Sequence, residues 1–183
     1  MKFIDVLKER IEKCDRCDLR GRGFAVERFV NSPRVMFIGE APGAEEEKLR
    51  IPFVGRAGKE LDRWISFLEV KNYIITNVVK HRPPDNRVPT NEEVLKCSYY
   101  LDIEIDYYKP KVLVLLGRTA SSILQNDTVK NLSDLIDLSI NSTLYYREVR
   151  VIVLFHPSYS LRTGIRPPLQ KAKEVIQRIV EDF

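Results

Sequence analysis

The chain has 183 residues, of which 44% are hydrophobic and 31% charged. This length favours one domain, residues 1–183, and the composition excludes a disordered or collagen-like chain. The 30 Lys and Arg residues against 26 acidic ones give a net charge of +4. That mild excess permits a polyanionic partner without requiring one.

Targeting signals and disulfides are not expected. The N-terminal segment through Cys17 carries charges throughout and has no signal-peptide core. The longest apolar run, which begins at Val112, is too short to span a bilayer. Three cysteines are an odd number, so metal binding, catalysis or burial is a better reading than a disulfide framework. We therefore expect a cytoplasmic protein with no membrane partner.

Hydrophobic spacing predicts helices and strands that mostly alternate along the chain. Thr90, followed by Glu93, is a capping-box pattern that starts a long helix. In chain order, the predicted elements are a helix over 3–14, a loop over 17–33, a strand over 34–40, a helix from about 57, a strand over 72–79, a loop over 81–89, a helix over 90–108, a strand over 111–117, a short helix over 118–125, a hairpin arm over 144–148, a strand over 149–157 and a last helix from about 167.

The predicted strands are almost wholly apolar, which is typical of a sheet covered on both faces. We therefore predict a three-layer α/β/α fold with a central four-stranded, mainly parallel sheet. Ligands of such sheets bind outside the carboxyl ends of the strands. The places to search are the positions just after Ile38, Thr76, Leu116 and Phe155.

Four residues near these strand ends could form a ligand site. Gly39 begins the tight turn GEAPG, which could let backbone N–H groups approach a ligand or could be an ordinary turn. Phe53 lies in a glycine-flanked loop, where it could stack on a flat ring or simply pack in the core. Asn77 could read a base edge or bond neighbouring backbone. His156 directly follows the last strand, a position that favours a functional role.

A second group of residues has metal-binding character. Cys14 and Cys17 form a C-x-x-C pair, and His81 and Cys97 could complete a set of four ligands. By ligand type alone, three cysteines and a histidine indicate zinc. An iron–sulfur cluster more often has four thiolates, with histidine ligation as a known exception. Simple burial of the cysteines is the remaining alternative.

Three sequence blocks together match a known family. They read GEAPGAEEEKLRIPFVGRAGKEL, ITNVVKHRPPDNRVPTNEEVLKC and HPSYSLR. In this order and spacing, from Cys14 to about Arg162, the chain resembles the family-4 uracil-DNA glycosylases. These are base-excision repair enzymes that carry a [4Fe–4S] cluster. The resemblance implies a uracil-DNA glycosylase-like fold and an enzyme that flips uracil out of DNA and hydrolyses its N-glycosidic bond, leaving an abasic site.

The resemblance also implies roles for residues of the pocket. Phe53 would stack on the extruded base and Asn77 would hydrogen-bond its polar edge. His156 would donate a hydrogen bond toward the uracil oxygen as negative charge develops there. Gly39 and Ala41 would line the substrate pocket, and Ala41 stands where other branches carry an aspartate that positions water.

Two acidic residues and a DNA-entry segment follow from the same resemblance. Glu40 and Glu46 would position water or stabilise the sugar cation. Ser158, Leu161 and Arg162 would enter the helix that the flipped base leaves. A basic rim around the pocket mouth would contact phosphates. Its expected members are Arg56, Lys80, Arg82, Arg87, Arg162 and Arg166.

His81 is the main departure from the family, which usually has a cysteine there. A related branch that traps uracil covalently has histidine at this ligand position and still holds a cluster. This precedent favours a [4Fe–4S] cluster over zinc, with Cys14, Cys17, His81 and Cys97 as ligands. The chain lacks that branch's basic insertion, so turnover is expected. The alternatives are a covalent uracil-trapping relative and a catalytically inactive, metal-stabilised nucleic-acid-binding module.

The expected partner is uracil-containing DNA, single- or double-stranded. We expect a monomer in the cytoplasm, associated with the nucleoid. A replication or repair partner is not deducible from the sequence.

Overall fold

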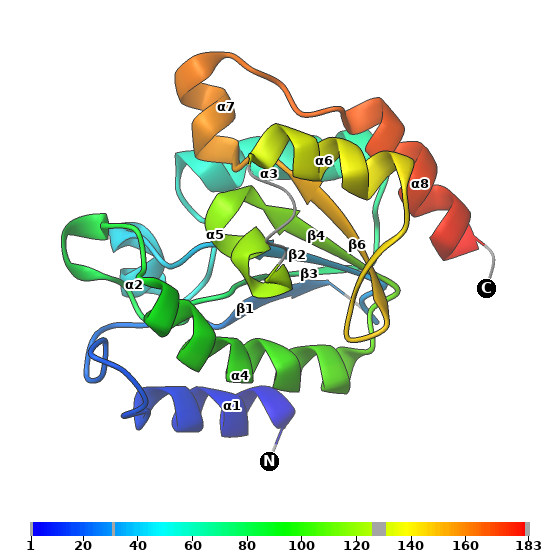
Figure 1. Cartoon of the computed structure of the whole chain (residues 1–183). Helices are drawn as coiled ribbons and strands as arrows, with labels where there is room; N and C mark the ends of the chain where they lie inside the picture. The colour runs from blue at the N-terminus through cyan, green and yellow to red at the C-terminus, as the bar shows by residue number, and fades with distance from the viewer. Residues whose placement is uncertain (1, 31, 126–130, 182–183) are drawn as a thin grey trace.

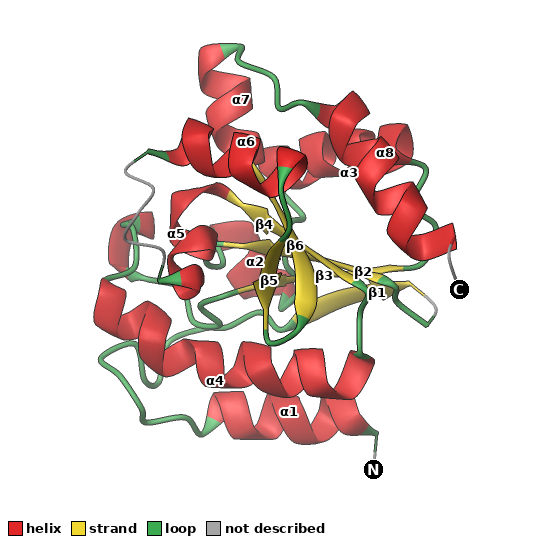
Figure 2. Ribbon diagram, turned by 45° about the vertical axis from the view of Figure 1, so that its right-hand side comes forward, coloured by secondary structure: helices red, strands yellow, loops and turns green. Residues whose placement is uncertain are grey.

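The computed structural model describes residues 2–30, 32–125 and 131–181. Helices cover both faces of a central sheet, as Figures 1 and 2 show. The strands are β1 (Glu27–Val30), β2 (Val35–Gly39), β3 (Tyr73–Asn77), β4 (Val112–Leu116), β5 (Leu144–Tyr146) and β6 (Val149–Leu154). The helices are α1 (Phe3–Glu12), α2 (Ala44–Leu49), α3 (Arg56–Leu68), α4 (Asn91–Tyr108), α5 (Gly117–Ser121), α6 (Leu132–Asn141), α7 (Pro157–Thr163) and α8 (Leu169–Glu181), with short 3-10 turns η1 (Pro84–Asn86) and η2 (Ser122–Leu124).

The sheet has six strands in the order β1-β3-β2-β4-β6-β5. The four inner strands are parallel, as predicted, whereas β1 and β5 run antiparallel at the two edges. The predicted class is therefore confirmed and the count of four strands is corrected to six. The hairpin arm is β5, but β1 lies in a segment predicted as loop. Because an edge strand has one neighbour and Phe29 of β1 is 50% exposed, β1 lacks the buried pattern of an inner strand.

Burial on both faces explains why the inner strands read as apolar runs. Every residue of β2 and β4 is buried. Helices α1 and α4 lie on one face of the sheet, and α3, α6 and α8 lie on the other (Figure 2). The side chains of β2 and β4 are therefore covered on both faces of the sheet, and these positions disfavour a charge.

Helix ends follow local chemistry where a strong signal exists. The capping box at the start of α4 is confirmed, because Thr90 Oγ1 accepts from the Glu93 backbone N–H at 3.2 Å and Glu93 Oε2 accepts from that of Thr90 at 2.8 Å. The last helix begins at Leu169, two residues after the expected Pro167. The sequence reading did not predict α2, α6 and α7, which are short helices of 6, 10 and 7 residues.

The carboxyl edge of the parallel strands is the edge from which α2, α5 and α7 begin. These helices follow β2, β4 and β6, so they begin beyond the same edge of the sheet (Figure 1). Within the described part of the chain, no helix has the length and apolar character needed to cross a membrane.

Candidate active site

Gly39 is the point at which the expected pocket residues meet. A Cβ atom at this position would lie 2.4 Å from Phe53 Cζ and 2.5 Å from Asn77 Oδ1. Both side chains therefore lie closer to the backbone of residue 39 than they could if this residue were not glycine. The structure thus brings together the end of β2, the loop that carries Phe53 and the end of β3.

Asn77 is a buried amide with an unused acceptor. Its side chain is 2% exposed, and Oδ1 has no hydrogen-bond partner among the described residues. A buried polar atom without a partner costs about 1–3 kcal/mol, so native proteins rarely tolerate one without a reason. The lack of a partner for Oδ1 among the described residues argues against the alternative that this oxygen accepts from neighbouring backbone. These observations favour an acceptor kept for a ligand.

Phe53 is held in a strained backbone conformation beside His156. Its φ angle is 55°, in the left-handed region that side chains other than glycine rarely adopt. Its ring is buried, 5.7 Å from the His156 ring between centroids and inclined to it by 32°. Strain of this kind costs about 1–3 kcal/mol and often marks functional sites.

Glu46 braces the loop that presents Phe53. Its Oε1 atom accepts from the backbone N–H groups of Val54 and Gly55, both at 3.0 Å. Its Oε2 atom accepts from the Gly43 N–H at 3.2 Å. The carboxylate therefore ties the turn after β2 to the Phe53 loop, and both of its oxygens are occupied by the backbone.

His156 caps α7 and is held as a neutral ring. Its Nδ1 atom accepts from the Ser158 backbone N–H at 3.2 Å and lies 2.7 Å from the Ser158 hydroxyl oxygen. A ring nitrogen that accepts from an N–H carries no proton, so the proton of the neutral ring is on Nε2. Burial lowers the pKa of His156 from 6.5 to about 4. Near neutral pH the residue is therefore an uncharged donor through Nε2–H.

Glu40 and Ala41 follow directly on Gly39. The half-buried side chain of Glu40 accepts a hydrogen bond from Thr119 Oγ1 to its Oε2 atom, at 2.5 Å. Ala41 is half-buried and packs against the hydrophobic core. Thr119 lies in α5, after β4, and the sequence reading had given it no role.

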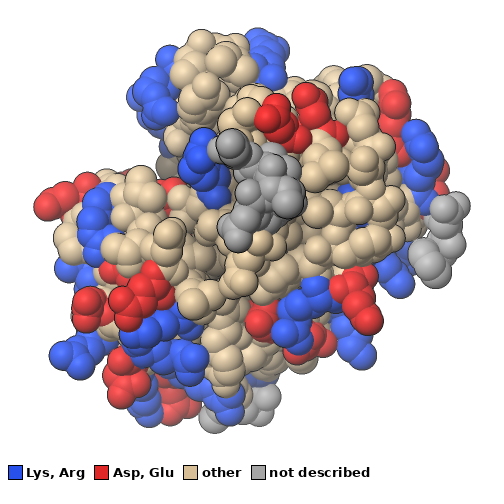
Figure 3. Space-filling view, viewed as in Figure 1, with Lys and Arg blue, Asp and Glu red and all other residues tan. Residues whose placement is uncertain are grey.

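Helix α7 presents the residues that the resemblance assigns to DNA. Ser158 is exposed, and so is Leu161, by 42%. The Arg162 guanidinium lies 5.6 Å from the centre of the Tyr159 ring. In Figure 3 the projecting end of the molecule at α7 carries Lys and Arg on either side.

The six residues of the predicted basic rim differ in exposure and in their partners. Arg56, Arg162 and Arg166 are exposed. Arg82 and Arg87 instead pair with Glu47 and Glu93 at 2.8 and 2.7 Å. The prediction for Lys80 was wrong, because this residue is fully buried.

Lys80 belongs to a buried polar cluster between the sheet and α4. Its Nζ atom lies 2.5 Å from Glu104 Oε2 and donates to Thr76 Oγ1 at 2.6 Å. The chain remains buried from β3 to His81, so the Lys80 side chain reaches α4 and not solvent. It joins the strand that ends in Asn77 to the helix that carries Cys97.

Comparison with known proteins shows the family to which this chain belongs. Residues 27–183 match the model of the uracil DNA glycosylase superfamily. The chain belongs to the uracil DNA glycosylase superfamily. The chain is similar to the type-4 uracil-DNA glycosylases of Sulfurisphaera tokodaii (37% identical, covering 100% of this chain and 83% of the relative), Thermotoga maritima (35%, 97% and 96%) and Archaeoglobus fulgidus (34%, 95% and 89%).

For this superfamily member, the four expected cluster ligands come from three converging segments. Cys14 and Cys17 follow α1, which runs along α4 (Figures 1 and 2), and Cys97 is in α4. The Cys97 sulfur accepts from the Lys80 backbone N–H at 3.2 Å, so Cys97 lies beside His81. Within 2–30, 32–125 and 131–181, no three His, Cys, Asp or Glu side chains are grouped closely enough to hold a metal ion as they stand.

The donor chemistry at these positions nevertheless fits a cluster. The buried His81 Nε2 atom has no hydrogen-bond partner in the described part of the chain. An imidazole nitrogen and a cysteine sulfur that accepts an N–H bond are both suited to iron. The orphaned nitrogen is the observation that most favours His81 as a ligand.

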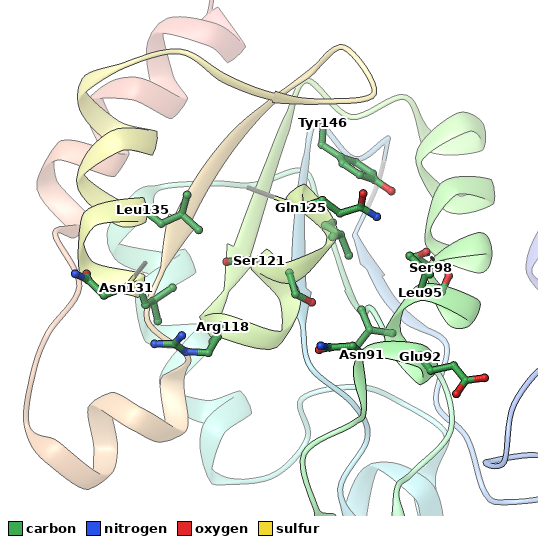
Figure 4. A pocket seen from close by; sticks show the side chains of 14 residues that line it. Asn91, Glu92, Leu95, Ser98, Arg118, Ser121, Gln125, Asn131, Leu135 and Tyr146 are labelled. Carbon is green, nitrogen blue, oxygen red and sulfur yellow. Dashed lines mark hydrogen bonds between the residues drawn. The ribbon is translucent and has the colours of Figure 1, made fainter. Parts of the chain in front are cut away.

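A separate hollow of about 670 Å³ lies between α4, α5 and the start of α6 (Figure 4). Arg118, Ser121, Asn91 and Asn131 contribute polar groups to a wall that leucine, isoleucine and valine side chains also line. None of the residues assigned here to uracil lines it. The expected pocket residues Gly39, Phe53 and Asn77 meet at the carboxyl edge of the sheet and not in this hollow.

Proposed function

We propose that this chain flips uracil out of DNA and hydrolyses its N-glycosidic bond at the pocket around Gly39. Membership of the superfamily makes it a uracil-DNA glycosylase of DNA repair, a hydrolase acting on N-glycosyl bonds. The observation that carries the assignment of the site is the buried, unpaired Oδ1 atom of Asn77 beside the Phe53 ring.

Asn77 and Phe53 would bind the extruded base. Phe53 offers a ring on which uracil stacks, and Glu46 holds the loop that carries this ring. Asn77 Oδ1 would accept from the uracil ring N–H while its amide N–H₂ donates to the adjacent carbonyl. Cytosine presents a ring acceptor and an amino group at the same edge, so both of its groups would face the wrong partner. Gly39 and Ala41 leave the pocket wall without a projecting polar side chain.

His156 and Glu40 would act on the bond that breaks. When the bond between C1′ and the base nitrogen breaks, its electron pair goes to uracil and the sugar becomes cationic. The neutral His156 would donate from Nε2–H to the uracil oxygen as the anion forms, and donors of this kind contribute about 2.7–4 kcal/mol. The Glu40 carboxylate would position water or stabilise the sugar cation. Water then bonds to C1′, and its released proton balances the charge of the departing uracil.

Helix α7 would contact the duplex during flipping. Leu161 is the exposed apolar side chain that would fill the gap left by the base. Ser158 and Arg162 lie within the same helix and would contact the backbone around that gap. The substrate is uracil-containing DNA, and the stack has to be filled only when that DNA is double-stranded.

Release of free uracil by the purified protein and two variants tests this assignment. We expect Asn77→Ala and His156→Ala each to lower the single-turnover rate by about 2–3 kcal/mol of barrier. Ser98→Ala, at a half-buried residue of α4 that lines the separate hollow, is the control and should leave the rate unchanged. Full activity in both site variants would contradict the assignment. A protein–DNA band that survives denaturation would instead indicate covalent trapping.

The proposal also includes a [4Fe–4S] cluster held by Cys14, Cys17, His81 and Cys97. It rests on the orphaned His81 nitrogen, on the N–H···S bond to Cys97 and on the convergence of the three segments. When bound, such a cluster would cross-link the segment after α1, the segment after β3 and helix α4. We assign it this structural role and no step of the hydrolysis.

Metal analysis of the purified protein tests the cluster. We expect a yellow-brown protein with about four irons and four sulfides per chain. His81→Cys, which supplies a fourth thiolate, should keep the colour and the activity, whereas His81→Ala should lose iron. A colourless protein with one zinc ion per chain would overturn the cluster. The three cysteines and the histidine would then bind zinc, as their ligand type alone indicates.

A further inference from the structure

The first turn of α5, directly after β4, contacts both side chains that are proposed to act on the scissile bond. This turn reads Gly117-Arg118-Thr119 and lies at the carboxyl edge, where ligands of parallel sheets bind. Gly117 lies against His156, and Thr119 bonds to Glu40. Arg118 and Ser121 of the same helix line the separate hollow instead (Figure 4).

The absence of a side chain at Gly117 leaves room for the His156 side chain. The φ angle of Gly117 is +87°, and a Cβ atom built on this residue would lie 2.9 Å from His156 Cβ. Any side chain at position 117 would therefore strain the turn and push the imidazole away. Because Ser158 fixes His156 from the other side through Nδ1, the ring has little freedom to adjust.

Thr119 holds one oxygen of Glu40. Its hydroxyl donates to Oε2 at 2.5 Å, which is the short distance expected when the acceptor is a carboxylate. The main chain of Glu40 is fixed as well, because its carbonyl accepts from the Val79 N–H at 3.0 Å. Between this fixed backbone and the Thr119 hydroxyl, the carboxylate has a defined orientation, with Oε1 left for another contact.

We propose that Thr119 is a positioning residue that orients the Glu40 carboxylate for water or for the sugar cation. The inference rests on the proposed function and deepens it, because it concerns the same site. A carboxylate that must meet a water molecule or a short-lived cation works only in a narrow range of orientations. Preorganising it before the bond breaks avoids a reorganisation during the reaction.

Two substitutions at position 119 separate the hydroxyl from the shape of the side chain. Thr119→Val keeps the branched shape and removes the donor, whereas Thr119→Ser keeps the donor and removes a methyl group. We expect Thr119→Val to lower the single-turnover rate of uracil release roughly tenfold to a hundredfold, with DNA affinity unchanged. Thr119→Ser should stay within about threefold of the parent rate. Thr119→Ala replaces Thr119→Val if the latter does not fold.

A comparison in the Glu40→Ala background shows whether Thr119 acts through Glu40. In that background Thr119→Val should cause no further loss, because the group that it orients is gone. A purely structural role would give the same loss in both backgrounds. Thr143→Val, in an exposed loop, is the matched control and should leave the rate unchanged.

The outcomes distinguish this inference from the function on which it rests. A parent protein that releases no uracil would overturn the proposed function, and this inference with it. An active parent with an equally active Thr119→Val variant would overturn the inference alone. A Thr119→Ser variant as slow as Thr119→Val would also overturn it, because packing and not the hydroxyl would then matter.

Discussion

His156 is the residue at which burial and hydrogen bonding combine to fix a protonation state. The Ser158 N–H bond to Nδ1 leaves the ring proton on Nε2, and burial lowers the pKa of the imidazole to about 4. A neutral donor serves a reaction that forms an anion and a cation side by side. A charged imidazolium would repel the sugar cation as well as attract the uracil anion.

The titration of His156 can be measured directly, because the chain has 2 histidines. We expect the NMR signal of the His156 ring carbon proton to titrate with a midpoint near pH 4 and to stay unchanged around pH 6.5. The signal is assigned by its loss in His156→Gln. A midpoint near 6.5 would contradict the lowered pKa of His156.

The same pKa shift predicts how stability depends on pH. The unfolded chain takes up the His156 proton near pH 6.5 and the folded chain near pH 4, so the unfolded state binds more protons between these values. The contribution of His156 is therefore complete above pH 6.5 and is lost as the pH falls to 4, by about 3 kcal/mol at most. His156→Gln should show a correspondingly shallower loss of unfolding free energy over this window. Equal slopes would contradict the shift.

At the scale of elements, the buried pair of Lys80 and Glu104 joins the segment after β3 to α4. Burial raises the pKa of Glu104, and Lys80 opposes that rise. We expect Lys80→Met to lower the unfolding free energy by about 3–5 kcal/mol, because it leaves a buried carboxylate without its positively charged partner. The double variant Lys80→Met/Glu104→Leu should recover most of this loss, since an apolar pair needs no compensation.

An exposed ion pair is the control for this stability measurement. Arg147→Met removes the 2.9 Å contact to Asp106 on the surface and should cost at most about 1 kcal/mol. Chemical denaturation of all three variants gives the comparison. A Lys80→Met variant no less stable than Arg147→Met would show that the buried pair does not stabilise the fold.

Helix α7 leads to a prediction about the form of the substrate. Leu161→Ala should slow uracil release from duplex DNA by about 1–2 kcal/mol of barrier and affect single strands less, because only a duplex has a stack to fill. Leu95→Ala, at a leucine that is 62% exposed on α4, is the control. Single-turnover rates on matched duplex and single-stranded oligonucleotides measure the difference. Equal losses on both forms would mean that Leu161 shapes the pocket and is not the wedge.

Elements were predictable where burial or capping leaves a pattern. The capping box could be recognised because Thr90 and Glu93 are three residues apart in the sequence. The inner strands could be recognised because helices cover them on both faces, which makes them apolar. Strand β1 was missed because an edge strand with an exposed Phe29 carries no such pattern. Helix α7 was missed because it spans 7 residues, too few to establish an apolar period.

The site was predictable in residue type and less so in contacts. Gly39, Phe53 and Asn77 meet as the order of strands implied. Lys80 was misplaced because the sequence shows a lysine beside a strand but does not show that the chain stays buried beyond the strand end. The contact of Thr119 with Glu40 could not be predicted from the sequence, because a hydroxyl residue after a strand is also a common start of a helix.

At the scale of the whole molecule, the proposed cluster ligands and the DNA-contacting helix lie on different sides of the sheet. Helices α1 and α4 pack on one face, and α7 projects beyond the other (Figures 1 and 2). The sheet between them carries Asn77 at the end of β3 and leads to His156 after β6. In this arrangement the proposed cluster would hold the scaffold, and the proposed chemistry would take place at the carboxyl edge.

The central claim is that the pocket around Gly39 hydrolyses the bond between uracil and its sugar. Incubation of the purified chain with a labelled oligonucleotide that contains one uracil tests it most directly. We expect free uracil, an abasic site that alkali cleaves, no release from the same oligonucleotide with cytosine, and a much slower release by Asn77→Ala. An intact oligonucleotide, or release that is as fast with Asn77→Ala, would contradict it.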